Sequence, residues 1–195
     1  MAKNYSNCGF SKLGSHVWKV NAGGNRYIDN VFMKKVYTQL EIMHLTYSQI
    51  NVIFFNLHLP KGQPHHDNAT VSKFMAKLRN LLKSAPYHLT RFAYVWVREK
   101  DKSEVPHYHL ALIVDESRIH YPSKLLERLV SIWKKVSHDG HLSNVRGCYH
   151  IVNRGDLSAL GEVIYRLSYL GKLRSKGNRK KSTNDYSTSR LKPGA

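Results

Sequence analysis

Residues 92–114, FAYVWVREKDKSEVPHYHLALIV, decide the fold class. Two runs rich in β-branched and aromatic residues, Phe92–Glu99 and His107–Val114, are separated only by the charged segment Lys100–Pro106. Neighbouring parallel strands need a crossover of about a dozen residues or more, usually a helix, and this segment is too short for one. The stretch therefore predicts a β-hairpin within an antiparallel sheet.

The elements predicted on either side of the hairpin alternate between helices and strands. Ile50–Leu59 (INVIFFNLHL) indicates a central strand, because it is apolar and β-branched before it begins to alternate. Helices are predicted from about Asp29 to His44, Asn68 to Pro86, Leu125 to Val136 and Asp156 to Lys172, with further strands at Ser15–Val20 and Cys148–Asn153. This order predicts an α+β fold, with an antiparallel, ferredoxin-like sheet that carries helices on one face.

Composition narrows the class of partner. The 195 residues include 31 Lys and Arg against 13 Asp and Glu, which gives a formal net charge of +18. Such an excess predicts a polyanionic partner, either nucleic acid or an anionic membrane surface. No apolar run approaches the ~18 residues of a transmembrane helix, and no signal peptide is expected, so nucleic acid is favoured. Two cysteines, Cys8 and Cys148, are too few for a disulfide framework and indicate a reducing setting.

The hairpin contains a candidate metal site. His107 and His109 are two apart on a strand, so both imidazoles point to one side and can converge on one ion. Glu99 ends the preceding strand and should lie near His107 across the hairpin mouth. Two imidazoles and a carboxylate suit Mn²⁺ or Mg²⁺ beside a phosphate. The spacing alone equally allows surface histidines and a glutamate that touches only solvent.

The last predicted helix carries a second candidate group. Tyr165, Tyr169 and Lys172 fall on one side of that helix, nearly opposite its apolar residues. A phenol becomes a useful nucleophile when a cation assists it, and Lys172 lies one turn from Tyr169. The alternative is a pair of amphipathic tyrosines that pack against a neighbouring element.

The order of these motifs resembles the HUH endonuclease superfamily, which includes rolling-circle replication initiators, relaxases and related transposases. The resemblance spans about residues 45–191: the matching pieces are Glu99, Pro106-His107-Tyr108-His109, the apolar Leu110–Ile113, and the Tyr165–Lys172 element. Tyr169-Leu170-Gly171-Lys172 with Ser189-Arg190-Leu191 is similar to the inovirus and prophage replication-protein family. Ile50–Leu59 occupies the place of the first, apolar strand motif of these initiators. The sequence departs from the family at Tyr108, where an aliphatic residue is common, and at Asn56 and His58 within Ile50–Leu59, whose role stays open.

The resemblance implies a ferredoxin-like, HUH-type sheet flanked by helices and a division into three parts. Residues 1–45 would be an N-terminal hairpin and helix appendage, 46–172 the HUH-type nuclease domain, and 173–195 a basic, flexible tail. Side chains expected to hold the DNA backbone lie in the tail: Arg174, Lys176, Arg179, Lys180, Lys181 and Arg190.

The activity that the resemblance implies is metal-dependent, site-specific nicking of single-stranded DNA with strand transfer. Mn²⁺ or Mg²⁺ on His107, His109 and Glu99 would polarise the scissile phosphate. Tyr169 would attack first, leaving a 5′-phosphotyrosine and a 3′-hydroxyl that primes rolling-circle replication of a phage, prophage or plasmid, and Tyr165 would make a second transfer. Lys172 would assist.

The resemblance also implies partners and a place in the cell. Single-stranded or supercoiled DNA at a replication origin is the expected substrate, host helicase and polymerase are further expected partners, and the bacterial cytoplasm is the expected location.

The competing hypothesis is a non-catalytic DNA-binding regulator on the same fold. Such a protein needs the charge and the aromatic residues, but neither the histidine pair nor the paired tyrosines.

Overall fold

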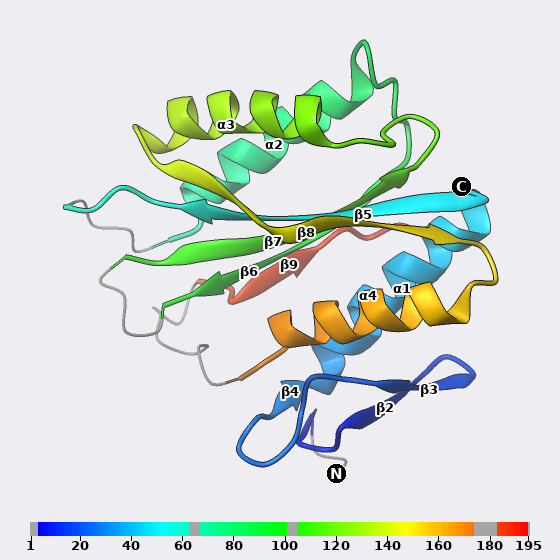
Figure 1. Ribbon diagram of the computed structural model, residues 1–195. Helices are drawn as coiled ribbons and strands as arrows, with labels where there is room; N and C mark the ends of the chain where they lie inside the picture. Colours follow the sequence, from blue (N-terminus) through cyan, green and yellow to red (C-terminus); the bar gives the residue numbers. More distant parts are fainter. Residues whose placement is uncertain (1–3, 63–66, 101–104, 174–182, 195) are drawn as a thin grey trace.

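A five-stranded antiparallel sheet forms the centre of the protein (Figure 1). The computed structural model describes residues 4–62, 67–100, 105–173 and 183–194. The sheet has the order β8-β5-β7-β6-β9. Its strands are β5 (Gln49–His58), β6 (Ala93–Glu99), β7 (His107–Asp115), β8 (His141–Asn153) and β9 (Tyr186–Thr188). With α2 (Ala69–Lys83) and α3 (Ser123–Ser137), the succession β5-α2-β6-β7-α3-β8 is ferredoxin-like, so the predicted fold class is confirmed.

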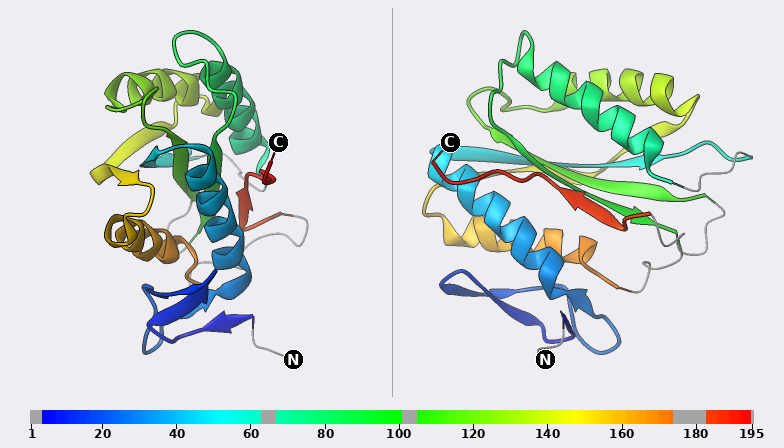
Figure 2. Two further views of the ribbon diagram at one scale, coloured as in Figure 1. Left: turned by 90° about the vertical axis from the view of Figure 1, so that its right-hand side faces the viewer. Right: turned by 180° about the vertical axis from the view of Figure 1, so that it is seen from behind.

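Helices cover both faces of the sheet, so the expectation of helices on one face was wrong. α2 and α3 lie on one face, and α1 (Asn30–Thr46) and α4 (Leu157–Leu170) lie on the other (Figures 1 and 2). The reason is the central strand β5, which is apolar on both sides. Val52 and Phe54 enter the core under α1 and α4, whereas Ile53 and Phe55 enter the core under α2 and α3.

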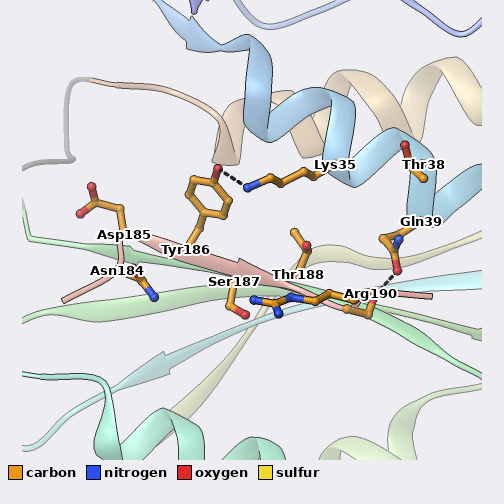
Figure 3. Close-up of a pocket in the computed structure, with 10 residues that line it drawn as sticks. Lys35, Thr38, Gln39, Asn184, Asp185, Tyr186, Ser187, Thr188 and Arg190 are labelled. Carbon is orange, nitrogen blue, oxygen red and sulfur yellow. Dashed lines mark hydrogen bonds between the residues drawn. The ribbon is translucent and has the colours of Figure 1, made fainter. Parts of the chain in front are cut away.

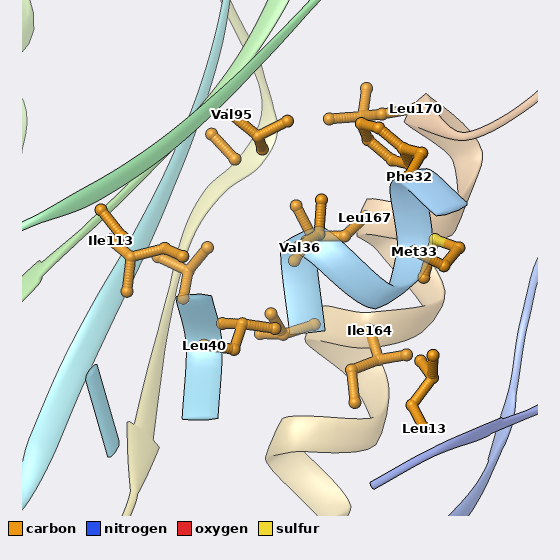
Figure 4. Close-up of a cluster of buried hydrophobic side chains, with 14 of the residues drawn as sticks. Leu13, Phe32, Met33, Val36, Leu40, Val95, Ile113, Ile164, Leu167 and Leu170 are labelled. Atoms are coloured by element: carbon orange, nitrogen blue, oxygen red, sulfur yellow. The ribbon is translucent and has the colours of Figure 1, made fainter. Parts of the chain in front are cut away.

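The helix predicted as part of an N-terminal appendage belongs to the main core. Asp29 caps α1, because its Oδ1 accepts hydrogen bonds from the backbone N–H groups of Val31 and Phe32 at 2.8 and 3.0 Å. Apolar side chains of α1 then meet those of α4 and the sheet (Figure 4). The labelled contacts include Phe32, Met33, Val36 and Leu40 of α1 with Ile164, Leu167 and Leu170 of α4.

Two small sheets near the N-terminus pack on the outside of α4 and α1. One pairs β1 (Tyr5–Ser6) with β4 (Ile28–Asp29), and the other pairs β2 (Phe10–Leu13) with β3 (His16–Lys19). They hold the end of α4 through the backbone: Asp29 N–H donates to the Gly171 carbonyl and Leu173 N–H donates to the Tyr27 carbonyl, each at 2.9 Å. The intervening residue, Lys172, is thereby fixed beside the sheet.

The expected flexible tail contributes a strand. Residues 174–182 lie outside the described residues, but Tyr186–Thr188 pairs with β6 at the edge of the sheet. Gln39 of α1 holds the segment that follows, because its Oε1 accepts hydrogen bonds from Ser189 Oγ at 2.8 Å and from Leu191 N–H at 2.9 Å. The expectation of a flexible tail therefore does not hold for this segment. No helix in the described residues is long and apolar enough to cross a membrane.

Candidate active site

The structure brings the three predicted metal ligands together at the mouth of the β6–β7 hairpin. Glu99 lies directly opposite His107 in the ladder, and His109 is two residues further along the same face. Glu99 Oε2 is 3.2 Å from His109 Nε2 and 3.9 Å from His107 Nε2, and the two Nε2 atoms are 3.1 Å apart. In the described part of the chain, no other three His, Cys, Asp or Glu side chains converge in this way.

Glu99 is a buried carboxylate that stays ionised. Burial raises the pKa of this group, but the hydrogen bonds and charges of His109 and Lys172 outweigh it and lower the pKa to about 2. Lys172 Nζ lies 3.2 Å from Oε2, an ion pair that the sequence did not predict. The other oxygen, Oε1, is buried and has no hydrogen-bond partner in the described structure. A buried carboxylate oxygen without a donor is a suitable ligand for a cation.

Asn56 of β5 sets the tautomer of His109. His109 Nδ1 lies 2.7 Å from Asn56 Oδ1, and an amide oxygen only accepts hydrogen bonds, so Nδ1 carries the proton. His109 Nε2 then faces Glu99 Oε2 at 3.2 Å and His107 Nε2 at 3.1 Å. Acceptor atoms that converge at these distances repel one another unless a cation or a proton lies between them. The residues present therefore fit a divalent metal ion, and Asn56 orients one ligand.

A stack of imidazoles supports the other ligand. His58 of β5 lies between His141 and His107, with ring centroids 4.3 and 5.5 Å away and planes 1° and 10° from parallel. His58 Nε2 is also 3.0 Å from Ser143 Oγ. Burial, followed by the charges of His141, His107 and His109, lowers the pKa of His58 to about 4. A neutral ring thus packs against His107 and restricts its orientation.

The two tyrosines lie beside this cluster. Tyr165 and Tyr169 are 39% and 45% exposed. A pocket of about 470 Å³ is lined by both tyrosines and by His109. Lys172 Nζ lies 3.9 Å from the centroid of the Tyr169 ring while it pairs with Glu99. The lysine therefore connects Tyr169 to Glu99.

Arg166, a further residue that lines this pocket, was not among the site residues predicted from the sequence. Arg166 of α4 lies over the Phe54 ring, with its Cζ 4.2 Å from the centroid, and its Nη1 is 2.8 Å from His150 Nε2. Arg166 Nη2 also donates to the Arg146 carbonyl at 3.1 Å. The pocket thus carries a fixed guanidinium, a group that binds phosphate well. The one signal in the sequence was an arginine between the two tyrosines.

The structure describes one of the six predicted DNA-binding residues. Arg190 is exposed just beyond β9. The other five, Arg174, Lys176, Arg179, Lys180 and Lys181, lie outside the described residues.

Comparisons with known proteins place the chain in a family. The model of the YagK/YfjJ C-terminal domain matches residues 19–186, a span that contains Glu99, His107, His109, Tyr165, Tyr169 and Lys172. Neither the search of curated proteins nor the search of solved structures found a match. Because the matched span covers most of the sequence, the chain belongs to the YagK/YfjJ C-terminal domain family.

Proposed function

We propose that this protein is a metal-dependent endonuclease that nicks single-stranded DNA at a specific site and transfers the strand through a tyrosine. The observation that carries this proposal is the pocket in which His109 and both tyrosines meet. One candidate metal ligand and two exposed phenols in one cavity would provide the parts that phosphodiester transfer needs: an electrophilic centre for the phosphate and a nucleophile beside it.

Glu99, His107 and His109 would hold Mn²⁺ or Mg²⁺, and the ion would polarise the scissile phosphate. Three protein ligands leave coordination positions open for phosphate oxygens. The chain itself supplies the orientation of the ligands, through Asn56 and the His58 ring, and a second cation, Arg166, for the phosphodiester.

Tyr169 is proposed as the first nucleophile. Its Oη would form a bond to phosphorus and lose its proton, while the bond from phosphorus to the 3′-oxygen breaks and that oxygen takes up a proton. The products are a 5′-phosphotyrosine and a strand with a free 3′-hydroxyl. Lys172 favours Tyr169, since its ammonium lies over that ring and stabilises developing phenolate charge. Tyr165 is proposed for the second transfer, which would close the displaced strand.

The biological setting belongs to the same proposal. The expected task is initiation of rolling-circle replication of a phage, prophage or plasmid in the bacterial cytoplasm. The substrate would be origin DNA, in single-stranded or supercoiled form, and host helicase and polymerase would act on the product.

A non-catalytic DNA-binding regulator is the second candidate, and one contact favours it. The Lys172 ammonium already pairs with Glu99 Oε2, so a lysine could stabilise the cluster without any metal. In that case the histidines and the glutamate would only connect α4 to the sheet.

Incubation with supercoiled and single-stranded DNA and Mn²⁺, followed by a denaturing gel, tests the two candidates. The nuclease predicts a covalent protein–DNA adduct that disappears in excess chelator and in His107→Ala. His138→Asn is the control, because His138 is an exposed histidine with φ 55°, a conformation that asparagine tolerates. DNA binding without cleavage in any metal would favour the regulator, and cleavage that persists in chelator would rule out the metal role.

A further inference from the structure

A recess lies on each side of the edge strand β9, on opposite faces of the sheet. The larger, about 610 Å³, lies between β9 and α1 and is lined by Lys35, Thr38 and residues 184–190 (Figure 3). The other, about 470 Å³, lies between β9 and α2 and is lined by Arg79, Lys83 and residues 187–191. Seen from behind in Figure 2, β9 lies between these two helices. One strand therefore borders two separate recesses.

β9 is the edge strand of the sheet, so one side of its backbone faces away from β6. Asp185, Ser187 and Ser189 direct their backbone groups toward β6, as shown by Arg98 N–H donating to the Asp185 carbonyl at 2.8 Å and Ser189 N–H donating to the Tyr94 carbonyl at 2.9 Å. Alternation then directs the backbone of Thr188 away from β6. No other strand of the described structure pairs with that side of β9.

Four cationic side chains border this edge. Lys35, Arg79, Lys83 and Arg190 are all exposed, and no carboxylate in the described part of the chain lies within salt-bridge distance of any of them. Figure 3 shows Lys35 reaching from α1 to the Tyr186 hydroxyl, 3.3 Å away, and Arg190 extending along β9. The strand itself adds hydroxyl groups from Ser187 and Thr188. Cations, hydroxyls and the outward backbone N–H of Thr188 are donors that suit phosphate oxygens.

Aromatic rings stand on both sides of the same edge. Tyr94 lines the recess beside α2, and Tyr186 lines the recess beside α1; both rings are partly exposed. Proteins that bind single-stranded nucleic acid combine a positively charged groove with aromatic side chains that contact the bases. An acidic peptide would use the cations but not the rings, so the combination favours a single-stranded nucleic acid.

We infer that the outer edge of β9 and its two recesses form a track for the phosphodiester backbone of single-stranded DNA. The choice of DNA rests on the proposed function. The position also fits that function: β9 pairs with β6, the strand that ends in Glu99, and Tyr186 lies opposite Val97. A strand on this edge would lead away from the metal ligands, so the track would hold the DNA on one side of the cleavage point.

The test compares two pairs of substitutions that remove equal charge. Lys35→Gln with Arg190→Gln removes two cations at β9, and Lys124→Gln with Lys135→Gln removes two exposed cations from α3, on a helix that lines neither recess. Binding of a fluorescent oligo(dT) is measured by anisotropy across a salt series, without metal. Each phosphate that the protein no longer neutralises should lower the slope of log K against log[salt] by about 0.7. The β9 pair of substitutions should thus lower the slope by about 1.4. Between 50 and 200 mM salt, the affinity of this variant for oligo(dT) should therefore fall by a factor about sevenfold smaller than the affinity of the wild type does.

Hydrogen exchange supplies a readout that does not depend on affinity. Amides of residues 184–191 should be protected by saturating oligo(dT) in the wild-type protein and in His107→Ala. Unchanged exchange there, or equal slopes for both pairs of substitutions, would overturn the track. The track would also be overturned if the protein forms a dimer and the β9 substitutions dissociate it while DNA affinity stays constant. The edge of β9 would then pair with a second copy of the chain.

The outcomes separate this inference from the proposed function. If β9 is protected and the slope falls while no covalent adduct forms, the track stands and the nuclease fails. If adducts form normally and the β9 substitutions change neither slope nor protection, the nuclease stands and the track fails.

Discussion

Tyr165 and Tyr169 line one pocket with His109, so the proposal distinguishes their roles only by the residues around each ring. Lys172 lies over Tyr169, whereas the nearest cation over the Tyr165 ring is Lys19, 5.8 Å from its centroid. Tyr169→Phe should therefore remove the first covalent adduct, because the attacking oxygen is lost while the exposed ring is retained. Tyr165→Phe should leave the first cleavage intact and impair recircularisation. Mass spectrometry of the nuclease-trimmed adduct locates the nucleotide, and a nucleotide on Tyr165 alone would reverse the assignment.

Asn56 should control metal affinity without touching the metal. Asn56→Leu removes the acceptor that holds the proton on His109 Nδ1, so the ring gains freedom of tautomer and orientation. We expect Mn²⁺ affinity, measured by calorimetry, to fall about 10- to 100-fold. Asn144→Ala, an exposed position of β8, is the control and should bind Mn²⁺ as the wild type does. Equal affinity in Asn56→Leu and wild type would mean that the contact is incidental.

The lowered pKa of His58 predicts that the free energy of unfolding decreases in weak acid. Its pKa is about 4 in the folded chain and about 6.5 when unfolded. Between these values the unfolded chain binds a proton that the folded chain does not, so the free energy of unfolding falls as the pH drops from 6.5 toward 4. His58→Phe retains a stacked ring without this titration and should lose about 1–2 kcal/mol less between pH 7.5 and pH 4.5. Urea unfolding in chelator measures the difference, and parallel pH profiles would contradict it.

At the scale of elements, local sequence patterns predicted the helices and the apolar strands, but they did not predict the polar edge strand or the contacts between distant elements. The four helices and strands β5, β6 and β7 lie close to their expected bounds, since each has a strong apolar period or an apolar run. β9 was missed because DYSTS has no apolar alternation, and β8 proved longer than the expected Cys148–Asn153. The sequence could predict that Glu99, His107 and His109 converge, because this follows from the pairing of two strands joined by a short hairpin loop. The contacts of Asn56 and Lys172 depend on which strands are neighbours and where α4 docks, which the sequence does not reveal.

Gln39 should hold β9 on the sheet. It is buried, and its Oε1 accepts hydrogen bonds from Ser189 and Leu191. Gln39→Ala leaves one buried and one part-buried donor without this acceptor, so we expect a loss of about 2 kcal/mol in the free energy of unfolding. Thr38→Ala, an exposed neighbour on the same helix, should change stability by less than about 0.5 kcal/mol. Chemical denaturation measures both, and equal effects would show that β9 is held by other contacts.

For the molecule as a whole, we expect Mn²⁺ binding to raise the Tm. The ligands belong to β6 and β7 of the folded sheet, so the folded chain should bind Mn²⁺ far better than the unfolded chain. At about 100 times the Kd, binding adds about 2.7 kcal/mol, which corresponds to a rise in Tm of about 5–10 °C for a chain of this size. The rise should disappear in chelator and in His107→Ala. An equal rise in His107→Ala would mean that the ion binds elsewhere.

The backbone contacts between Asp29 and Gly171, and between Tyr27 and Leu173, have a consequence for biosynthesis. They join segments from near the two ends of the chain, with the whole ferredoxin-like succession between them. Contacts of such sequence separation form slowly, since a long loop must close first. Lys172 reaches Glu99 only after this closure. A chain still on the ribosome, or one cut short before α4, would therefore lack the assembled cluster of Glu99 and Lys172, and the proposed nicking activity would be confined to molecules whose synthesis has passed α4.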